Sequence, residues 1–420
     1  MEKIIIQNVR ILDPASGRDE QGSIYIENGV FSAPFESADG AVVIDGSGLT
    51  AAPGLVDLHV HLRDPGQTQK EDILTGCRAA AAGGVTSLLA MPNTSPAVDS
   101  TETVSYILEK AKNADAHVYV VGAITKGLKS QQATDIDELY RAGISALSDD
   151  GRPVENTVMM VNAMKKAAAL GIPVTAHCED PYLAGGKVNE GRVSEALAVK
   201  GMPRAAEDAG TAREISLAAA YDVPVHICHV STKTSANMIR AAKRDGVKVT
   251  AETAPHYLML TEDAVMTRDA DYRMNPPLRT EDDRLAMIEA LCDGTIDSIA
   301  TDHAPHTPEE KADFVSAPNG SIGMETSFAA SYTVLVKGGY MSEAQLIEKM
   351  SCAPARILGI KAGSLAEGQT ADVMLYKKED WTVDPDALHG KSRNTPFKGL
   401  TLAAKVKLTV CGGRIVFNEI

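Results

Sequence analysis

The stretch AAPGLVDLHVHL, residues 51–62, indicates a buried strand that carries two histidines. Its apolar residues leave little room for a solvated face, which is typical of a strand covered on both sides. Side chains two residues apart on a strand point the same way, so His59 and His61 are expected to share one face. Two buried imidazoles cost stability unless they have partners, so the stretch predicts a strand that presents a ligand pair. The alternative is two polar residues on the solvated face of an edge strand.

Seven further short, β-branched runs follow this strand along the chain. They are residues 85–91, 117–123, 143–148, 172–177, 223–229, 247–253 and 296–302. Stretches rich in Ala, Leu, Glu and Lys with helical periodicity separate the runs. Eight alternating strand and helix units favour an α/β fold, a closed (β/α)8 barrel of the TIM type, over an open doubly wound sheet.

Both ends of the chain have a different pattern, with alternating strand residues broken by Gly, Pro and Asp. The runs are residues 3–12, 22–30 and 41–48 near the start, and 371–377, 405–410 and 414–417 near the end. Short isolated hairpins are marginal in water, so the two ends are expected to pair. The sequence therefore predicts a small β-sandwich domain from residues 1–52 plus 363–420, and a barrel domain over residues 53–362.

Composition narrows the range of partners. The chain has 420 residues and a formal net charge of −15, which argues against broad binding to nucleic acid or to an anionic membrane. The longest uncharged stretch, residues 79–98, contains Gly and Pro and is not expected to span a membrane. No secretory signal is visible, and six scattered cysteines without a CxxC pair indicate reduced thiols. A cytoplasmic protein is expected.

Chemically capable side chains lie at the ends of the predicted strands. His177, His229 and Asp302 each close one of the runs, and His59 and His61 close the first. Barrel enzymes place their chemistry on this face, so the sequence predicts a metal site there. Taken singly, His177 and His229 could equally be satisfied core histidines. Nitrogen and carboxylate ligands without thiolate suit Zn²⁺, and also Mn²⁺, Co²⁺ or Fe²⁺.

Four histidines exceed what a mononuclear catalytic zinc site uses, and a binuclear site needs a bridging anion. The candidates are Asp149 and Asp150 in the sequence SDDG, although an acidic pair before glycine is also a common turn. His226 is expected to face away from His229 and to be structural.

Eight motifs along the chain resemble the class I, bacterial-type dihydroorotases of the amidohydrolase superfamily. They are GLVDLHVHLRDPG (54–66), MPNT (91–94), SDDG (148–151), AHCED (176–180), HVST (229–232), NPPLR (275–279), ATDHAPH (300–306) and APNGSIGMET (317–326). The resemblance covers essentially the whole chain. It implies a barrel with a terminal β-sandwich, a cytosolic homodimer, and the reversible cyclisation of N-carbamoyl-L-aspartate to L-dihydroorotate in pyrimidine (UMP) biosynthesis.

The resemblance also implies the ligand set of two Zn²⁺ ions per subunit. His59, His61 and Asp302 would hold one ion, His177 and His229 the other, and Asp150 would bridge them. Asp150 lies 27 residues before His177, which matches the family spacing. Relatives with a carboxylated lysine as the bridge carry it at the end of the fourth strand, where GISALSDDG, residues 143–151, has no lysine.

For the substrate, the resemblance implies a clamp on the exocyclic carboxylate and contacts to the ring amides. Arg63, Asn93 and His306 match the clamp, and Asn275 with the backbone of Asn319 and Gly320 matches the ring contacts. Asn93 could instead be a helix cap and residues 319–320 a plain turn, and position 319 is often a larger apolar residue in the family. In the implied mechanism a metal-activated hydroxide attacks the ring carbonyl, with Asp302 as general acid and base.

Two rival functions make different predictions. A hydantoinase or allantoinase would need a bridging lysine and no clamp. A non-catalytic dihydroorotase-like subunit that serves as a scaffold for aspartate transcarbamoylase would lack metal ligands, whereas all six positions are filled here. Association of an active enzyme with aspartate transcarbamoylase is compatible with the resemblance. Residues 305–321, rich in Pro, Gly and charge, are expected to form a loop near the site.

Overall fold

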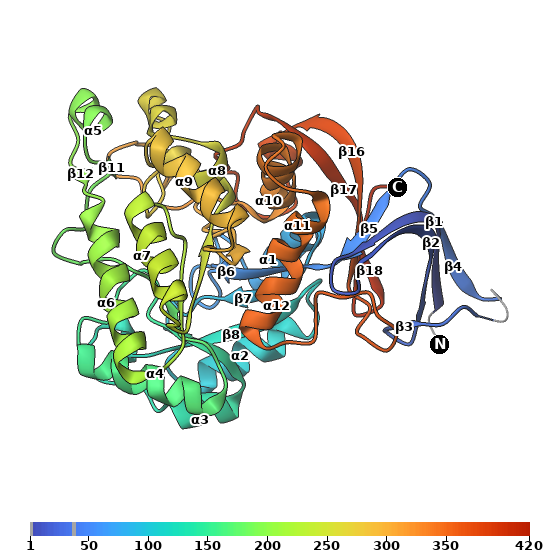
Figure 1. Ribbon diagram of the computed structural model, residues 1–420, viewed down its shortest axis with the longest axis horizontal. Helices are drawn as coiled ribbons and strands as arrows, with labels where there is room; N and C mark the ends of the chain where they lie inside the picture. The colour runs from blue at the N-terminus through green and yellow to red at the C-terminus, as the bar shows by residue number, and fades with distance from the viewer. Residues whose placement is uncertain (1–2, 36–38) are drawn as a thin grey trace.

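The computed structural model describes residues 3–35 and 39–420, and its larger unit is built on eight parallel strands (Figure 1). They coincide with the eight predicted runs: β6 (Leu55–Val60), β7 (Val85–Ala90), β8 (His117–Ala123), β9 (Ile144–Ser148), β10 (Thr175–Ala176), β13 (Val225–Ile227), β14 (Val249–Thr253) and β15 (Ser298–Ile299). Two sheets, β6-β7-β8-β9 and β10-β13-β14-β15, are joined by parallel bridges between Leu147 and Val174 and between Val60 and His303. The ring therefore closes, and the predicted (β/α)8 barrel is confirmed.

Helices alternate with these strands and cover the barrel (Figure 1). They are α1 (Ile73–Ala82), α2 (Thr101–Ala111), α3 (Ile136–Ala142), α4 (Thr157–Leu170), α6 (Ala205–Tyr221), α7 (Lys233–Arg244), α9 (Glu281–Cys292) and α10 (Met324–Ser331), followed by α11 (Glu343–Ile347) and α12 (Ala353–Leu358). Local sequence sets their ends. Asn156 caps the first backbone N–H groups of α4, and Gly171 ends that helix with a left-handed φ of 71°.

Short elements between β10 and α9 extend the carboxyl side of the barrel. They are β11 (Val188–Asn189), α5 (Arg192–Leu197), β12 (Gly201–Met202) and α8 (Pro255–Met259). No helix within residues 3–35 and 39–420 is long and apolar enough to cross a bilayer.

Both ends of the chain form one mixed sheet beside the barrel. Its strands are β1 (Lys3–Asp13), β2 (Arg18–Glu27), β3 (Val30–Ser32), β4 (Ala41–Asp45), β5 (Thr50–Pro53), β16 (Val373–Thr382), β17 (Thr401–Cys411) and β18 (Arg414–Asn418). The order is β18-β17-β16-β5-β1-β2-β3. β4 pairs with the first half of β1, and β5 pairs with a later part of the same edge of β1. The predicted pairing of the two ends is confirmed. The predicted sandwich is one continuous mixed sheet whose two parts separate at β1. One apolar cluster, with side chains from β1, β2, β4, β16 and β17, fills the space between the two parts.

The predicted division into residues 1–52 plus 363–420 and residues 53–362 stays a prediction, and positions 1–2 and 36–38 lie outside the described residues. One segment crosses that division. Residues 383–400, between β16 and β17, leave the sheet, and Val383 and Phe397 pack against Ala329 and Ala330 of α10. This segment brings Asn394 to the mouth of the barrel.

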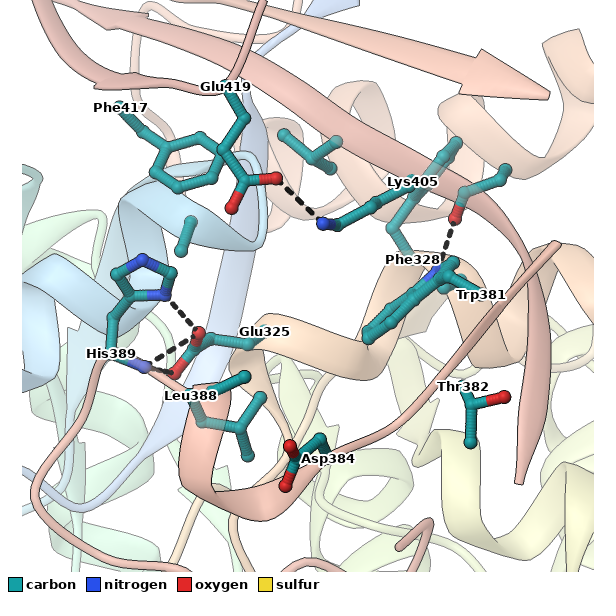
Figure 2. A pocket seen from close by; sticks show the side chains of 15 residues that line it. Glu325, Phe328, Trp381, Thr382, Asp384, Leu388, His389, Lys405, Phe417 and Glu419 are labelled. Carbon is teal, nitrogen blue, oxygen red and sulfur yellow. Dashed lines mark hydrogen bonds and ion pairs between the residues drawn. The ribbon is translucent and has the colours of Figure 1, made fainter. Parts of the chain in front are cut away.

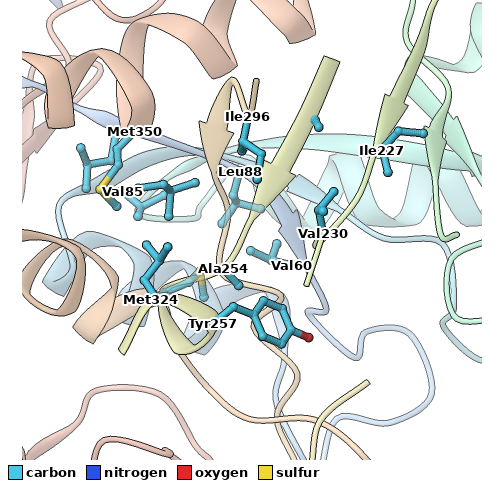
Figure 3. Close-up of a cluster of buried hydrophobic side chains, with 14 of the residues drawn as sticks. Val60, Val85, Leu88, Ile227, Val230, Ala254, Tyr257, Ile296, Met324 and Met350 are labelled. Atoms are coloured by element: carbon cyan, nitrogen blue, oxygen red, sulfur yellow. The ribbon is translucent and has the colours of Figure 1, made fainter. Parts of the chain in front are cut away.

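Apolar side chains from neighbouring strands fill the barrel wall and the layer beneath the helices (Figure 3). Val60 of β6, Leu88 of β7 and Ile227 of β13 are all buried in this cluster. Because the strands are covered on both sides, their sequences are nearly continuous apolar runs, which is why they could be recognised.

Replacing Leu88 by Ala should leave a cavity and destabilise the protein by about 2–5 kcal/mol. We expect a lower midpoint of thermal unfolding with unchanged metal content at room temperature. Leu285→Ala, at an exposed position on α9, is the control and should change the midpoint little. Equal effects of the two substitutions would contradict the assigned core.

Candidate metal centre

The six predicted ligands lie at the carboxyl ends of five barrel strands, and all are buried. His59 is the penultimate residue of β6, and His61 follows its end. The others lie within a few residues of a strand end: Asp150 after β9, His177 after β10, His229 after β13 and Asp302 after β15. His229 and Asp302 have left-handed backbones, with φ of 36° and 48°. This conformation costs free energy for a residue other than glycine. It turns the two side chains out of strand geometry and into the barrel mouth.

Asp150 lies between the histidines. Its Oδ1 is 3.2 Å from His59 Nε2, 3.7 Å from His177 Nδ1 and 3.9 Å from His229 Nε2. Its Oδ2 is 3.6 Å from His61 Nε2. One carboxylate therefore reaches all four imidazoles, which is the arrangement that a bridging ligand requires.

Asp149, the other candidate in the sequence, is turned away from the histidines. Its Oδ1 accepts hydrogen bonds from the backbone N–H groups of Ile124 and Thr125, at 2.7 and 3.0 Å. Its Oδ2 accepts from the Thr125 hydroxyl. Asp149 thus fixes the loop after β8.

Asp302 completes a second group with the first histidine pair. Its Oδ1 is 3.0 Å from His61 Nε2 and 3.6 Å from His59 Nε2. A tetrahedral zinc ion with bonds of about 2.0–2.1 Å holds its ligand atoms roughly 3.3 Å apart, so this spacing fits a cation.

Two atoms of the cluster have no hydrogen-bond partner. Among the described residues, His59 Nε2 and Asp150 Oδ1 are buried without a hydrogen bond, and they lie 3.2 Å apart. Buried polar atoms are nearly always bonded, so these two point to a bound ion. Burial alone would raise the pKa of Asp150, but the neighbouring His59, His229 and His61 outweigh it and hold the pKa well below its usual value. Asp150 is therefore ionised, as a metal ligand must be.

Glu252 of β14 fixes the orientation of His59. The His59 Nδ1–H donates to Glu252 Oε1 at 3.1 Å, which leaves Nε2 free for a cation. His226 Nε2 lies 3.1 Å from Glu252 Oε2, and Thr250 Oγ1 lies 2.9 Å from His226 Nδ1. His226 therefore supports Glu252 and lies outside the group of candidate ligands. Glu252 was not among the residues predicted from the sequence, although a carboxylate inside the apolar run 247–253 was a signal of the kind that identified Asp302.

Asp57 ties the first strand to the segment that carries Asp302. Its Oδ1 accepts from the backbone N–H of Thr301 at 3.0 Å and its Oδ2 from the Thr301 hydroxyl at 2.6 Å. Burial raises the pKa of Asp57 to about 7, against the effect of these hydrogen bonds. This residue, too, was missed from the sequence.

A cavity opens above the centre at the barrel mouth. Its lining includes all of the predicted site residues except His59, which lies beneath it with 0% exposure: His61, Arg63, Asn93, Asp150, His177, His229, Asn275, Asp302, His306, Asn319 and Gly320, together with Gly151 and Ala304. Ligand atoms and possible substrate contacts thus share one space.

Arg63 offers an unneutralised positive charge to this cavity. Its side chain is 8% exposed, and it forms no ion pair with any carboxylate of the described chain. Its Nε donates to the carbonyl of Pro305 at 3.2 Å, and one Nη lies 3.5 Å from His306 Nε2. Burial lowers the pKa of Arg63 to about 10, which still leaves the guanidinium charged at neutral pH.

Asn93 and Asn275 make their contacts beside the ligands. The His61 Nδ1–H donates to Asn93 Oδ1 at 2.8 Å, and Asn93 Nδ2 lies 3.5 Å from Asp150 Oδ2. Asn275 donates to Glu179 at 2.9 Å, and its buried Oδ1 has no hydrogen-bond partner among the described residues. The Asn275 carbonyl is therefore available to a ligand N–H.

Residues 305–321 form the predicted loop beside the site, and buried contacts hold it. Arg273 donates to the carbonyls of Phe314 and Val315 at 2.6 and 3.0 Å and to Asn319 Oδ1 at 2.8 Å. Gly320 has a φ of 132°, and a Cβ there would lie 2.7 Å from the Ala304 Cβ, so glycine is required. No local pattern in the sequence marked Arg273.

Asn394, from the segment that crosses out of the sheet, also fastens this loop. Its Nδ2 donates to the carbonyls of Ala304 and Gly320 at 3.2 and 3.1 Å, and its Oδ1 accepts from the His306 backbone N–H at 3.2 Å. The carbonyl of Asn319 is 3.0 Å from His306 Nε2. The backbone carbonyls of Asn319 and Gly320 are thus already engaged within the protein.

A closed barrel with this cluster at its carboxyl face defines a metal-dependent amidohydrolase. Residues 50–416 match the model of the Amidohydrolase family. A dihydroorotase of Geobacter metallireducens is 49% identical over 423 residues, covering 99% of this chain and 100% of the relative. A dihydroorotase of Clostridioides difficile is 45% identical over 421 residues, with 99% and 100% covered. The chain belongs to the dihydroorotase family within the amidohydrolases.

Solved structures share the fold at lower identity. The L-hydantoinase (dihydropyrimidinase) of Arthrobacter aurescens superposes with a TM-score of 0.89 at 24% identity, covering 100% of this chain and 97% of that one. The dihydropyrimidinase of Brevibacillus agri gives 0.86 at 25% identity, covering 99% and 95%. These likenesses concern the fold.

Removing the carboxylate of Glu252 should weaken metal binding, because the partner that orients His59 is lost. We expect Glu252→Leu to lower metal affinity by about 10–100-fold and Glu252→Gln, which keeps an acceptor, to lower it less. Competition with a chromophoric chelator measures this. Glu367→Gln, at an exposed position, is the control, and metal affinity in Glu252→Leu equal to the control would contradict the role.

Proposed function

We propose that this protein, as a class I dihydroorotase, catalyses the reversible cyclisation of N-carbamoyl-L-aspartate to L-dihydroorotate in pyrimidine (UMP) biosynthesis. The observation that carries the proposal is Arg63, a buried guanidinium without an ionic partner in the described chain, in the same cavity as the His and Asp cluster. A cyclic amide that bears a carboxylate matches both features: the carboxylate suits the guanidinium and the amide suits the metal centre.

Two Zn²⁺ ions per subunit are proposed as the cofactors. His59, His61 and Asp302 would hold one, His177 and His229 the other, and Asp150 both, in keeping with the separations of 3.0–3.9 Å around Asp150 and Asp302. When bound, such ions polarise a carbonyl and lower the pKa of a coordinated water toward about 7.

Substrate would be oriented by side chains that already line the cavity. Arg63, with Asn93 and His306, is proposed to bind the exocyclic carboxylate, and a planar guanidinium suits bidentate capture. Asn275 would bind a ring amide through its free carbonyl oxygen. Contacts from the backbone of Asn319 and Gly320 would have to replace bonds that His306 and Asn394 make there, so this part of the site is proposed to adjust when substrate binds.

Asp302 is proposed as the general acid and base. Burial would raise its pKa, but the hydrogen bond from His61 and the charges of His59 and His61 hold the pKa far below its usual value, so the carboxylate is ionised and carries no proton before the reaction. In ring opening it takes a proton from the attacking water and delivers it to the leaving amide nitrogen. In cyclisation it takes the proton from the carbamoyl nitrogen, since microscopic reversibility requires the same residue in both directions.

A hydantoinase or allantoinase activity is the rival proposal, and a hydantoinase shares the fold. Against it, the described lining of the cavity contains Asp150 and no lysine, and it contains Arg63. A purely scaffolding role is disfavoured because all six ligand positions are filled. Purified protein of measured metal content should be assayed side by side with dihydroorotate, hydantoin and allantoin. Turnover of dihydroorotate far above the other two is expected, and preferred turnover of hydantoin or allantoin would overturn the proposal.

A cytoplasmic homodimer, with association to aspartate transcarbamoylase as a further possibility, remains part of the proposal. Six free cysteines, five of them buried, are in keeping with a reducing compartment. The net charge of −15 supports a small-molecule substrate over nucleic acid or an anionic membrane.

Asp302→Asn should keep metal while losing most turnover, because the amide keeps an oxygen ligand but cannot carry the proton. We expect kcat to fall by about 10²–10⁴-fold. Metal analysis and steady-state kinetics on one sample measure both, with Asp293→Asn at the end of α9 as the control. Near wild-type turnover would refute the acid and base assignment.

Arg63→Ala should weaken dihydroorotate binding far more than metal binding. Loss of a charge-assisted contact predicts roughly a tenfold to hundredfold rise in KM, and Arg63→Lys should lie between, since a point charge replaces the planar fork. If metal and substrate affinity fell together, Arg63 would be structural.

A further inference from the structure

We propose that His117, Asp372 and Cys411 form a second metal site, for a thiophilic divalent cation such as Zn²⁺, at the end of the barrel opposite the catalytic cavity. His117 begins β8, Asp372 directly precedes β16, and Cys411 ends β17. The site is independent of the proposed function.

The three side chains converge closely enough to share one ion. One ligand atom from each lies within 4.8 Å of the others, and His117 Nε2 is 3.1 Å from Asp372 Oδ1. An imidazole, a carboxylate and a thiolate are ligands that zinc accepts, and three of them leave a fourth position for water. The number and kinds of these ligands therefore suit an open tetrahedral site.

The surroundings hold the carboxylate in place. The backbone N–H of Gly412 donates to Asp372 Oδ1 at 2.8 Å, and the side chains of Asp372 and Cys411 are buried. Hydrogen bonds to a ligating carboxylate of this kind are common around metal sites. The His117 side chain is 38% exposed, which gives a cation a path from solvent.

The position at the junction of the two units suggests what the metal would do. β8 runs seven residues from His117 toward the catalytic mouth, so the two sites are roughly 20 Å apart. His117 belongs to the barrel, whereas Asp372 and Cys411 belong to the sheet formed by the chain ends. A shared ion would link barrel and sheet and stabilise their contact, because binding to the folded state alone adds to stability.

The cavity between α10, β17 and β18 does not bring three metal-ligating side chains together in this way (Figure 2). Its charged groups other than Asp384 are paired with one another. Glu325 accepts from the backbone N–H and Nδ1 of His389 at 2.7 and 2.8 Å, and Lys405 pairs with Glu419 at 2.7 Å. The group at His117 differs because it brings a buried thiol to an imidazole and a carboxylate.

Cd²⁺ titration of the purified holoenzyme tests the site, because a thiolate bound to Cd²⁺ has an ultraviolet charge-transfer band that nitrogen and oxygen ligands do not produce. The catalytic metals are quantified first. We expect one equivalent of Cd²⁺ to give the band and to raise the midpoint of thermal unfolding. Cys411→Ser should abolish the band, and His117→Gln, which keeps the buried thiol, should weaken Cd²⁺ binding at least tenfold.

Two matched cysteine variants complete the experiment. Cys352→Ser, at a buried thiol outside any ligand cluster, should keep the band. Cys228→Ser should keep it as well, although Cys228 lies beside His59 and Glu252. Absence of the band, its persistence in Cys411→Ser, or its loss only in Cys228→Ser would overturn the proposal and leave His117 and Asp372 as an ion pair only. If Cys411→Ser fails to fold, unchanged Cd²⁺ affinity in His117→Gln overturns it.

Discussion

A single buried carboxylate, that of Asp150, lies within reach of four imidazoles, and the architecture around it is organised to make this possible. Burying a charge is costly unless partners surround it, and here they come from the ends of β6, β10 and β13. Together with β9, which carries Asp150, four strands must therefore end at one place for the charge to be satisfied. A closed parallel barrel achieves this, because the carboxyl ends of all its strands meet at one face.

Behind the ligands, a second set of side chains decides which nitrogen faces inward. Glu252 accepts a hydrogen bond from the Nδ1–H of His59, and Asn93 accepts one from the Nδ1–H of His61, so both rings present Nε2 to the centre. Asp57 joins β6 to the segment of Asp302. Each of these contacts joins residues that are far apart in sequence. The geometry of the centre therefore depends on closure of the barrel. The negative charge of the whole chain describes its surface, whereas under the proposed function attraction for an anionic substrate would be local, at Arg63 and the candidate metal centre.

Much of this arrangement was predictable from sequence because it follows local patterns. Covered strands are apolar runs, and the candidate ligands stand where the runs end, so all eight strands could be located and five of the six candidate ligand positions named. The strands themselves are shorter than the runs: β10 and β15 have two residues each. The chain leaves strand geometry before the apolar run ends, which turns the candidate ligands into the barrel mouth, as the left-handed backbone of Asp302 shows. The apolar periodicity of the sequence gives no sign of this change in backbone conformation.

Other features depend on contacts between distant segments. The choice between Asp149 and Asp150 was open from the residues alone, because only the fold gives Asp149 the backbone of Ile124 and Thr125. Asn394 reaches Ala304 across 90 residues from a segment expected to belong wholly to the small domain. Such long-range hydrogen bonds have no local sequence signature.

The most direct test of the account is anomalous diffraction at the zinc edge from crystals of the zinc-loaded protein. Two peaks about 3.5–4 Å apart, with the Asp150 carboxylate between them, are predicted. One peak alone, or two peaks that Asp150 does not contact, would contradict the account.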